Sequence, residues 1–227
     1  MSRSLLYRYF ERRALNALVS GQYEKAETYF LTLIQRWGSH PGLAHNVGLA
    51  QFALKKYDQA ETNFLAELEA YGETEERLKA LGDLYFAWGR REDAQKRYAE
   101  ALRLAQEADP PSRPPEAEIR FLQKRISLCS HDDRFSQAQG SLALLDRGNS
   151  LLAEGRWDEA YAAFEAAVAA DPTCYPALNN LGYIALNHRR AYADAAARFR
   201  SAAALSPLPT VRQNLLLAEQ LGSKTAT

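Results

Sequence analysis

The sequence predicts an all-α protein in which short helical hairpins stack in a row as an α-solenoid. One pattern recurs along the chain, an alanine followed four residues later by an aromatic residue. The step from one such alanine to the next is 34 residues between Ala26 and Ala60, and 34 again between Ala60 and Ala94. A single hairpin cannot bury both of its faces, so this period indicates that neighbouring hairpins cover one another. The five anchor alanines are Ala26, Ala60, Ala94, Ala160 and Ala195, and the aromatic residues are Phe30, Phe64, Tyr98, Phe164 and Phe199.

Residues 141–174 show the first helix of a hairpin most clearly. Leu144, Leu145, Leu151 and Leu152 share one stripe of a helix. Gly148 lies inside that helix, where glycine costs about 1 kcal/mol relative to alanine. That cost predicts a packing reason, namely a second helix backbone passing close by.

The turn and the second helix of this hairpin carry their own signals. Gly155 is expected to end the first helix, because glycine adopts the left-handed conformation at low cost. Asp158 suits the N-cap or the first turn of the next helix. Asp171-Pro172 ends that helix, since proline cannot continue the hydrogen-bond ladder. A glycine also stands five residues before the anchor alanine in two other repeats, at Gly21 and Gly89.

The period and this small-and-aromatic signature resemble the tetratricopeptide repeat (TPR) family. Apolar–glycine pairs in the first helices, Val47-Gly48, Leu81-Gly82 and Leu181-Gly182, also match that family. Repeats one and four depart from it, with Arg13-Ala14 and Arg147-Gly148. The resemblance implies a right-handed α-solenoid of about five TPR helix–turn–helix hairpins, with a degenerate middle repeat and a C-terminal capping helix.

Residues 1–108 hold the first three predicted repeats. The first repeat pairs a helix over residues 3–20 with one from Tyr23 to Arg36. The second runs from Pro41, a residue that suits the first helical position, to about Tyr71. The third runs from about Thr74 to Ala108, where Asp109-Pro110 interrupts it.

The period breaks in residues 109–140. A segment with four prolines is expected to be extended or turn-like, a helix is expected over 116–130, and a polar loop is expected from His131 to Gly140. We interpret 109–140 as a proline-rich linker and degenerate repeat helix. Two alternatives stay open: a spacer or hinge between two stacks, and a continuous superhelix. Residues 141–227 hold two more repeats and a capping helix from Pro209 to Leu221, which hides the apolar end of the stack.

Charge and composition narrow the classes of partner. Basic and acidic residues number 28 each, so no overall field draws the chain onto nucleic acid or an anionic membrane. No apolar run approaches the length of a membrane span, and MSRSLLYRYFERR is unlike a secretory signal. The two cysteines, Cys129 and Cys174, match neither a disulfide framework nor a metal pair, although one disulfide stays open. We therefore expect a cytoplasmic protein.

Catalytic motifs are missing from the sequence. The four histidines are scattered, and no phosphate-binding loop or nucleophile elbow is present. His131, Asp132 and Asp133 form a cluster, but in the expected polar loop we interpret them as solvated. The sequence predicts neither an enzyme nor a cofactor or metal site.

The family resemblance implies a concave groove lined by the first helix of each hairpin. Positions counted back from the anchor alanines give polar and aromatic candidates for peptide binding. These are Arg8, Arg12, Asn46, Phe52, Lys79, Asp83, Phe86, Asn149, Asn180, Tyr183 and Asn214.

Asparagines stand out in this set, because an amide both donates and accepts and so suits the backbone of an extended peptide. Asn149 and Asn180 match two amide positions of the family's carboxylate-clamp subtype, which grips a partner's C-terminus. Leu145, Thr210 and Asn214 stand where that subtype places bases, which argues against a true clamp. The alternative is that the asparagines satisfy neighbouring backbone groups.

The leading hypothesis is a non-catalytic adaptor or scaffold that binds a peptide or partner segment in the groove. Self-association is an alternative, in which exposed Tyr7 and Phe10 at a solenoid end form a homodimer interface. A third hypothesis is an accessory, chaperone-like subunit of a larger complex. Nucleic-acid binding is disfavoured by the neutral charge and by Asp83 and Asp146 in the expected groove.

Overall fold

A computed structural model describes residues 5–225, apart from the side chains of Pro41 and Thr225. Every regular element in this range is an α-helix, so the predicted all-α class is confirmed. Residues 3 and 4, at the start of the first predicted helix, lie outside the described residues. The helices are α1 (Leu5–Val19), α2 (Tyr23–Trp37), α3 (Pro41–Ala53), α4 (Tyr57–Tyr71), α5 (Glu75–Trp88), α6 (Arg91–Glu107), α7 (Glu116–Cys129), α8 (Asp132–Ala153), α9 (Trp157–Ala170), α10 (Tyr175–Asn187), α11 (Tyr192–Ala203) and α12 (Pro209–Thr225).

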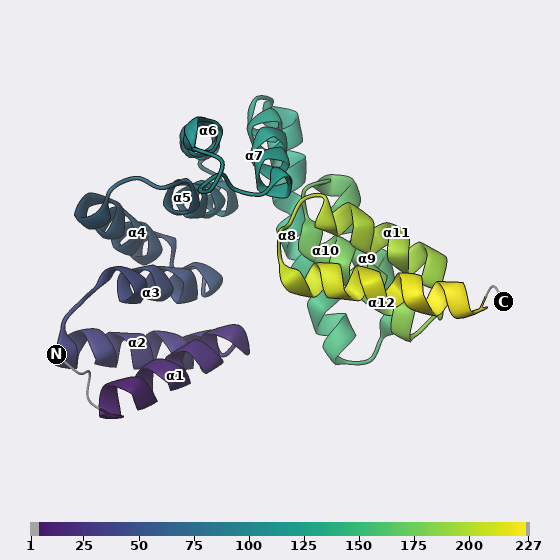
Figure 1. Cartoon of the computed structure of the whole chain (residues 1–227), viewed down its shortest axis with the longest axis horizontal. Coiled ribbons are helices and arrows are strands. Elements are labelled where there is room, and N and C mark those ends of the chain that lie inside the picture. The colour runs from purple at the N-terminus through teal and green to yellow at the C-terminus, as the bar shows by residue number, and fades with distance from the viewer. Residues whose placement is uncertain (1–4, 226–227) are drawn as a thin grey trace. The chain divides into compact units, whose positions relative to one another are not determined.

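The chain forms two compact units, Met1–Trp88 and Gly89–Thr227. In unit 1, α1 packs on α2 and α3 packs on α4 as hairpins, and α2 packs on α3 (Figure 1). The core of the first hairpin contains Ala26, Phe30 and Leu33, which pack with Val47 of the second. The anchor alanine and its aromatic partner therefore lie in the core, as the pattern predicts.

In unit 2, α6 packs on α7, α8 on α9, and α10 on α11, while α12 covers α11 (Figure 1). One core cluster joins the α8–α9 hairpin to α10 through Ala160, Phe164 and Leu181. A second contains Ala195, Phe199 and Ala218, so α12 covers the last hairpin as a cap.

The first-helix glycines are explained by the aromatic residues of the same repeats. A Cβ atom added at Gly48, Gly148 or Gly182 would lie 2.6, 2.5 or 2.7 Å from the ring of Phe64, Phe164 or Phe199. The expected reason for Gly148, a close helix backbone, is therefore wrong. An aromatic ring of the second helix lies against the glycine instead.

The turn inside each hairpin uses one backbone conformation in all five repeats. Gly155 has the predicted positive φ, +74°. In the two repeats without glycine at that position, Lys55 and Arg190 take φ of 59° and 53°. The hairpin geometry is thus kept where the sequence departs from glycine.

The middle segment differs from its prediction in one respect. The polar loop expected from His131 to Gly140 is wrong, because α8 begins at Asp132 and continues without a break into repeat four. Phe135 and Ala138 are buried in the added turns, and the acids at the start of α8 favour the positive end of the helix dipole. The intervening polar residues hide this spacing in the sequence.

The helix predicted over 116–130 is present as α7 and is built into unit 2. The ring of Phe121 on α7 lies 6.4 Å from that of Tyr98 on α6 and 6.3 Å from that of Tyr175 on α10. Arg125 Nη1 also lies 3.0 Å from Asp171 Oδ2 at the end of α9. The division into 1–108, 109–140 and 141–227 stays a prediction.

Candidate functional site

A row of asparagine amides crosses three helices of unit 2. Asn180 Nδ2 on α10 donates a hydrogen bond to Asn149 Oδ1 on α8, at 2.9 Å. Asn214 Nδ2 on α12 donates to Asn179 Oδ1 on α10, at 3.2 Å. The bonded residues are 31 and 35 positions apart, about one repeat, so each bond joins one layer of the helical stack to the next. The structure therefore brings three predicted site residues, Asn149, Asn180 and Asn214, into one row.

A pocket of about 400 Å³ lies beside this row. Tyr183 is 42% exposed at its edge, one turn from Asn179 and Asn180 on α10. The indole of Trp157 stacks on the His188 ring at 5.2 Å, which fixes the aromatic wall of the pocket. Its lining residues are Asn149, Leu152, Ala153, Trp157, Asn179, Asn180 and Tyr183.

The amides keep capacity for a further ligand. A primary amide has two N–H donors and an oxygen with two lone pairs, and each mutual bond uses one of these on either side. The predicted alternative, that the asparagines bond to neighbouring backbone, does not hold for these pairs, because they bond to each other across helices. Such mutual bonds hold the amides in place while leaving donors and acceptors for a peptide backbone.

The charged and polar site residues predicted in unit 1 differ from one another in exposure and in their contacts. Arg8 and Arg12 are exposed on α1, and Asn46 is half-buried on α3. Lys79 Nζ lies 3.1 Å from Asp83 Oδ2 within α5, so these two residues form an ion pair.

The two aromatic candidates of unit 1 are partly or wholly covered. The half-buried ring of Phe52 lies 6.4 Å from that of Tyr57. Phe86 is only 2% exposed, so its expected place on an open groove is not what the structure shows. A phenylalanine that packs in the core and one that faces a groove look alike in sequence.

Comparison with known families gives the decisive result. A tetratricopeptide repeat model matches residues 12–73 and 145–208, together more than half of the chain. The chain belongs to the tetratricopeptide repeat family. No curated protein matches the sequence.

Several solved TPR structures resemble the chain at low identity. MamA AMB-1 is 17% identical, with 88% of this chain and 92% of that chain covered and a TM-score of 0.42. YrrB, described as a TPR protein with an unusual peptide-binding site, is 18% identical, with 91% and 88% covered and a TM-score of 0.41. The TPR2AB domain of yeast Sti1, in complex with pHSP90, is 12% identical, with 97% and 86% covered and a TM-score of 0.43.

The TPR pocket of unit 2 lacks the bases of a carboxylate clamp. None of its described lining residues is lysine or arginine. Leu145, which stands where a clamp would place a lysine, packs against the hydrophobic core of the α8–α9 hairpin. The site therefore offers neutral hydrogen-bonding groups and aromatic surface, without a fixed cation for a C-terminal carboxylate.

Sequence reasoning missed Trp157 as a lining residue, although a signal for it exists. It lies three residues before the anchor Ala160, and Tyr23, Tyr57 and Tyr192 occupy that position in other TPR repeats. Tyr57 stacks on Trp88 at 5.8 Å as Trp157 stacks on His188, and both partners lie 31 residues further along. An aromatic residue at this position thus marks the contact with the next first helix.

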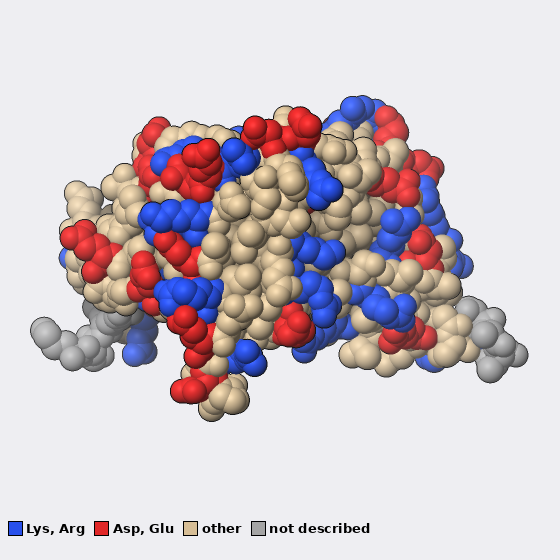
Figure 2. All heavy atoms as spheres, turned by 90° about the horizontal axis from the view of Figure 1, so that it is seen from above, with Lys and Arg blue, Asp and Glu red and all other residues tan. Residues whose placement is uncertain are grey.

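Other kinds of site find little support in the described part of the chain. No group of three histidine, cysteine, aspartate or glutamate side chains there is placed to hold a metal ion. None of the described helices is both long and apolar enough to span a membrane. On the face shown in Figure 2, basic and acidic side chains are interspersed.

Proposed function

We propose that this TPR protein is a non-catalytic adaptor or scaffold that binds an extended segment of a partner protein in the amide-lined pocket of unit 2. TPR proteins are in general protein-interaction modules without catalysis of their own. The finer assignment, to this pocket, rests on one observation: amides from α8, α10 and α12 stand in a row beside an open aromatic wall.

The chemistry of the pocket indicates the kind of segment it takes. The spare donors and acceptors of Asn149 and Asn180 suit the N–H and C=O groups of an extended backbone, which recur in every sequence. Trp157 and Tyr183 suit an apolar or aromatic side chain beside that backbone. Without a lining cation, recognition does not require a C-terminal carboxylate. An internal segment is therefore a suitable ligand.

A crosslinked pull-down from the native host tests this proposal. Wild type is compared with the variant Asn149→Ala, Asn180→Ala and with the control Gln123→Ala, Gln137→Ala, which removes two exposed amides of α7 and α8. Circular dichroism first establishes that all three are equally helical. A partner lost only from the asparagine variant supports the pocket, whereas a partner kept by all three moves the binding site elsewhere.

Self-association is a second candidate, favoured by exposed leucines on the capping helix. Leu216 is 57% exposed and Leu217 is 44% exposed on α12. The residues first expected to form this interface do not fit, because Tyr7 is only 2% exposed and Phe10 is half-buried. Light scattering over a range of concentrations tests the homodimer, since a constant monomer mass would exclude it. A cytoplasmic location and a chaperone-like accessory role stay part of the proposal.

A further inference from the structure

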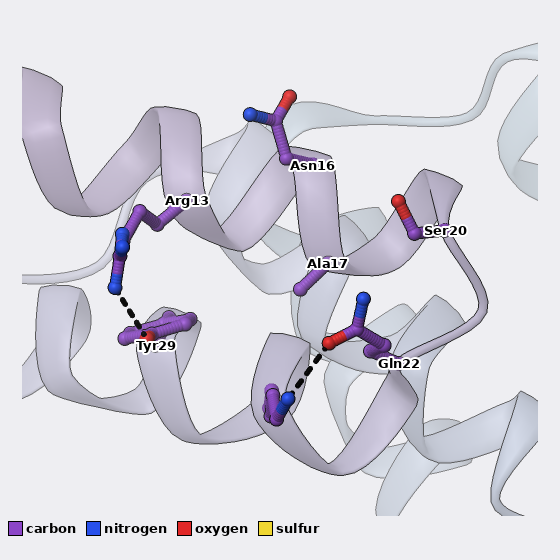
Figure 3. Close-up of a pocket in the computed structure, with 7 residues that line it drawn as sticks. Arg13, Asn16, Ala17, Ser20, Gln22 and Tyr29 are labelled. Atoms are coloured by element: carbon purple, nitrogen blue, oxygen red, sulfur yellow. Dashed lines mark hydrogen bonds between the residues drawn. The ribbon is translucent and has the colours of Figure 1, made fainter.

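A second cleft lies in unit 1, between α1 and α2 of the first repeat (Figure 3). Its volume is about 320 Å³. Arg13 and Tyr29 stand at one end, Gln22 at the other, and Ala17 lies between them. The corresponding positions of the second and third repeats show which kind of side chain binds there.

In the second repeat, the matching positions hold a carboxylate of the preceding repeat. Gln51 and Lys56 lie nine and four residues before the anchor Ala60. Gln51 Nε2 donates to Glu27 Oε1 of α2 at 3.3 Å, and Lys56 Nζ lies 2.6 Å from Glu27 Oε2. Glu27 directly follows the anchor alanine of repeat one.

The third repeat makes the same kind of contact with a glutamate of the preceding repeat. Tyr85 lies nine residues before the anchor Ala94, and its hydroxyl donates to Glu61 Oε1 of α4 at 2.7 Å. Glu61 directly follows Ala60, as Glu27 follows Ala26. In both places, therefore, the glutamate after an anchor alanine bonds to the residue nine positions before the next anchor.

In the first repeat, these positions line the open cleft. Ala17 and Gln22 lie nine and four residues before Ala26, where Gln51 and Lys56 lie in repeat two. Ala17 is small, so space is left where the longer side chains of Gln51 and Tyr85 reach their glutamates.

The cleft is also basic. Arg13 Nη1 donates to Tyr29 Oη at 3.3 Å, and Lys25 Nζ donates to Gln22 Oε1 at 2.8 Å. Both partners are neutral, and neither cation forms an ion pair with another described residue. Among the residues that the structure describes, none that lines the cleft is acidic. A carboxylate placed there would gain a charge-assisted partner, Arg13 at one end of the cleft or Lys25 at the other.

We propose that the α1–α2 cleft of repeat one is a docking site for an α-helix of a partner protein that presents a glutamate or aspartate. The partner helix takes the place that α2 takes on repeat two and α4 takes on repeat three. Its carboxylate follows a small residue and precedes an aromatic residue by three positions, as in Ala26-Glu27 with Phe30 and Ala60-Glu61 with Phe64. This site is independent of the amide pocket of unit 2.

A synthetic helix with the α4 sequence, residues 57–71, is the probe. A hydrocarbon staple on its outer face keeps it helical, because isolated helices of this length are marginal in water. Fluorescence anisotropy with the full chain is expected to show saturable binding. Binding is expected to weaken tenfold or more for the peptide carrying Glu61→Gln and for the protein variant Arg13→Glu, Lys25→Glu.

The protein variant Arg134→Glu, Arg212→Glu is the matched control, because it reverses two exposed arginines of unit 2. It is expected to bind the probe as wild type does. No saturable binding, or equal loss in both charge variants, would overturn the proposal. A dimer in sedimentation that the Arg13→Glu, Lys25→Glu variant abolishes would also overturn it, by assigning the cleft to a second copy.

Discussion

Gly148 on α8 lies directly against the ring of Phe164 on α9, so that a Cβ at position 148 would stand 2.5 Å from Cε1. Gly48 with Phe64 and Gly182 with Phe199 repeat the relationship. Helix propensity and packing therefore oppose each other at these glycines. Alanine would favour the helix, but its methyl group has no room unless the ring moves.

Gly148→Ala is expected to destabilise the protein by about 1–3 kcal/mol, the usual range for overpacking a core. Urea denaturation measures the change. The control is Gly140→Ala on the same helix, where nothing lies within 4 Å of an added Cβ. The Gly140→Ala variant is expected to have a free energy of unfolding up to about 1 kcal/mol higher, because alanine has a higher helix propensity than glycine. Equal effects of the two substitutions would contradict the packing explanation.

Arg190→Gly is expected to raise stability by about 0.5–1 kcal/mol. Arg190 has φ of 53°, a left-handed conformation that costs a residue with a Cβ about 1–2 kcal/mol. Glycine removes this cost but loses part of the gain through the greater entropy of its unfolded chain. Thermal unfolding measures the shift in Tm. A lower Tm in the variant would show that contacts of the Arg190 side chain stabilise the fold by more than its left-handed backbone conformation costs.

Asp171→Ala is expected to cost about 3–5 kcal/mol, because it leaves the charge of Arg125 without its buried carboxylate. Asp171 is 1% exposed, and its Oδ1 also accepts hydrogen bonds from the backbone N–H and the hydroxyl of Thr173. The double variant Arg125→Met, Asp171→Ala is expected to recover part of the loss. Additive losses in denaturation experiments would show that the two side chains are not coupled.

Cys129 and Cys174 are expected to resist alkylation in the folded protein. Both are free and buried, and burial raises the pKa of each thiol from 9.0 to about 11. The reactive thiolate is therefore scarce at neutral pH. Iodoacetamide labelling with and without denaturant measures the difference, and rapid labelling of the native protein would contradict the burial.

The same thiols predict a loss of stability in alkali. The folded protein holds these protons more tightly than the unfolded chain, so the thiols contribute their full stabilisation below about pH 9. That contribution is lost as the pH rises toward about 11. The variant Cys129→Ala, Cys174→Ala is expected to show a weaker decline over this window in denaturant titrations.

The repeat architecture was predictable because periodic signals reinforce one another. The alanine–aromatic register placed Ala160 and Phe164 in the core, and Gly155 marked the turn. The start of α8 was not predictable in this way, because the polar residues from Asp132 to Gly140 hide the buried Phe135 and Ala138. Lys55 and Arg190 show that a turn conformation persists without the glycine that signals it.

The candidate site was predictable only in part. Counting from the anchor alanines found Asn149, Asn180 and Asn214, since their spacing is a property of the repeat. It did not distinguish the buried Phe86 from the exposed Tyr183, because burial depends on neighbouring helices. The Glu27 contacts with Gln51 and Lys56 were also hidden, since they require the relative placement of two hairpins.

The most direct test of the adaptor function is site-specific photo-crosslinking at the amide pocket. A photoreactive phenylalanine replaces Tyr183 in one protein and Tyr71, an exposed tyrosine of unit 1, in another. A partner protein is expected to crosslink at position 183 and not at 71, and the variant Asn149→Ala, Asn180→Ala is expected to abolish the product. A partner that crosslinks only at position 71, or at 183 regardless of the asparagines, would contradict this function of the pocket.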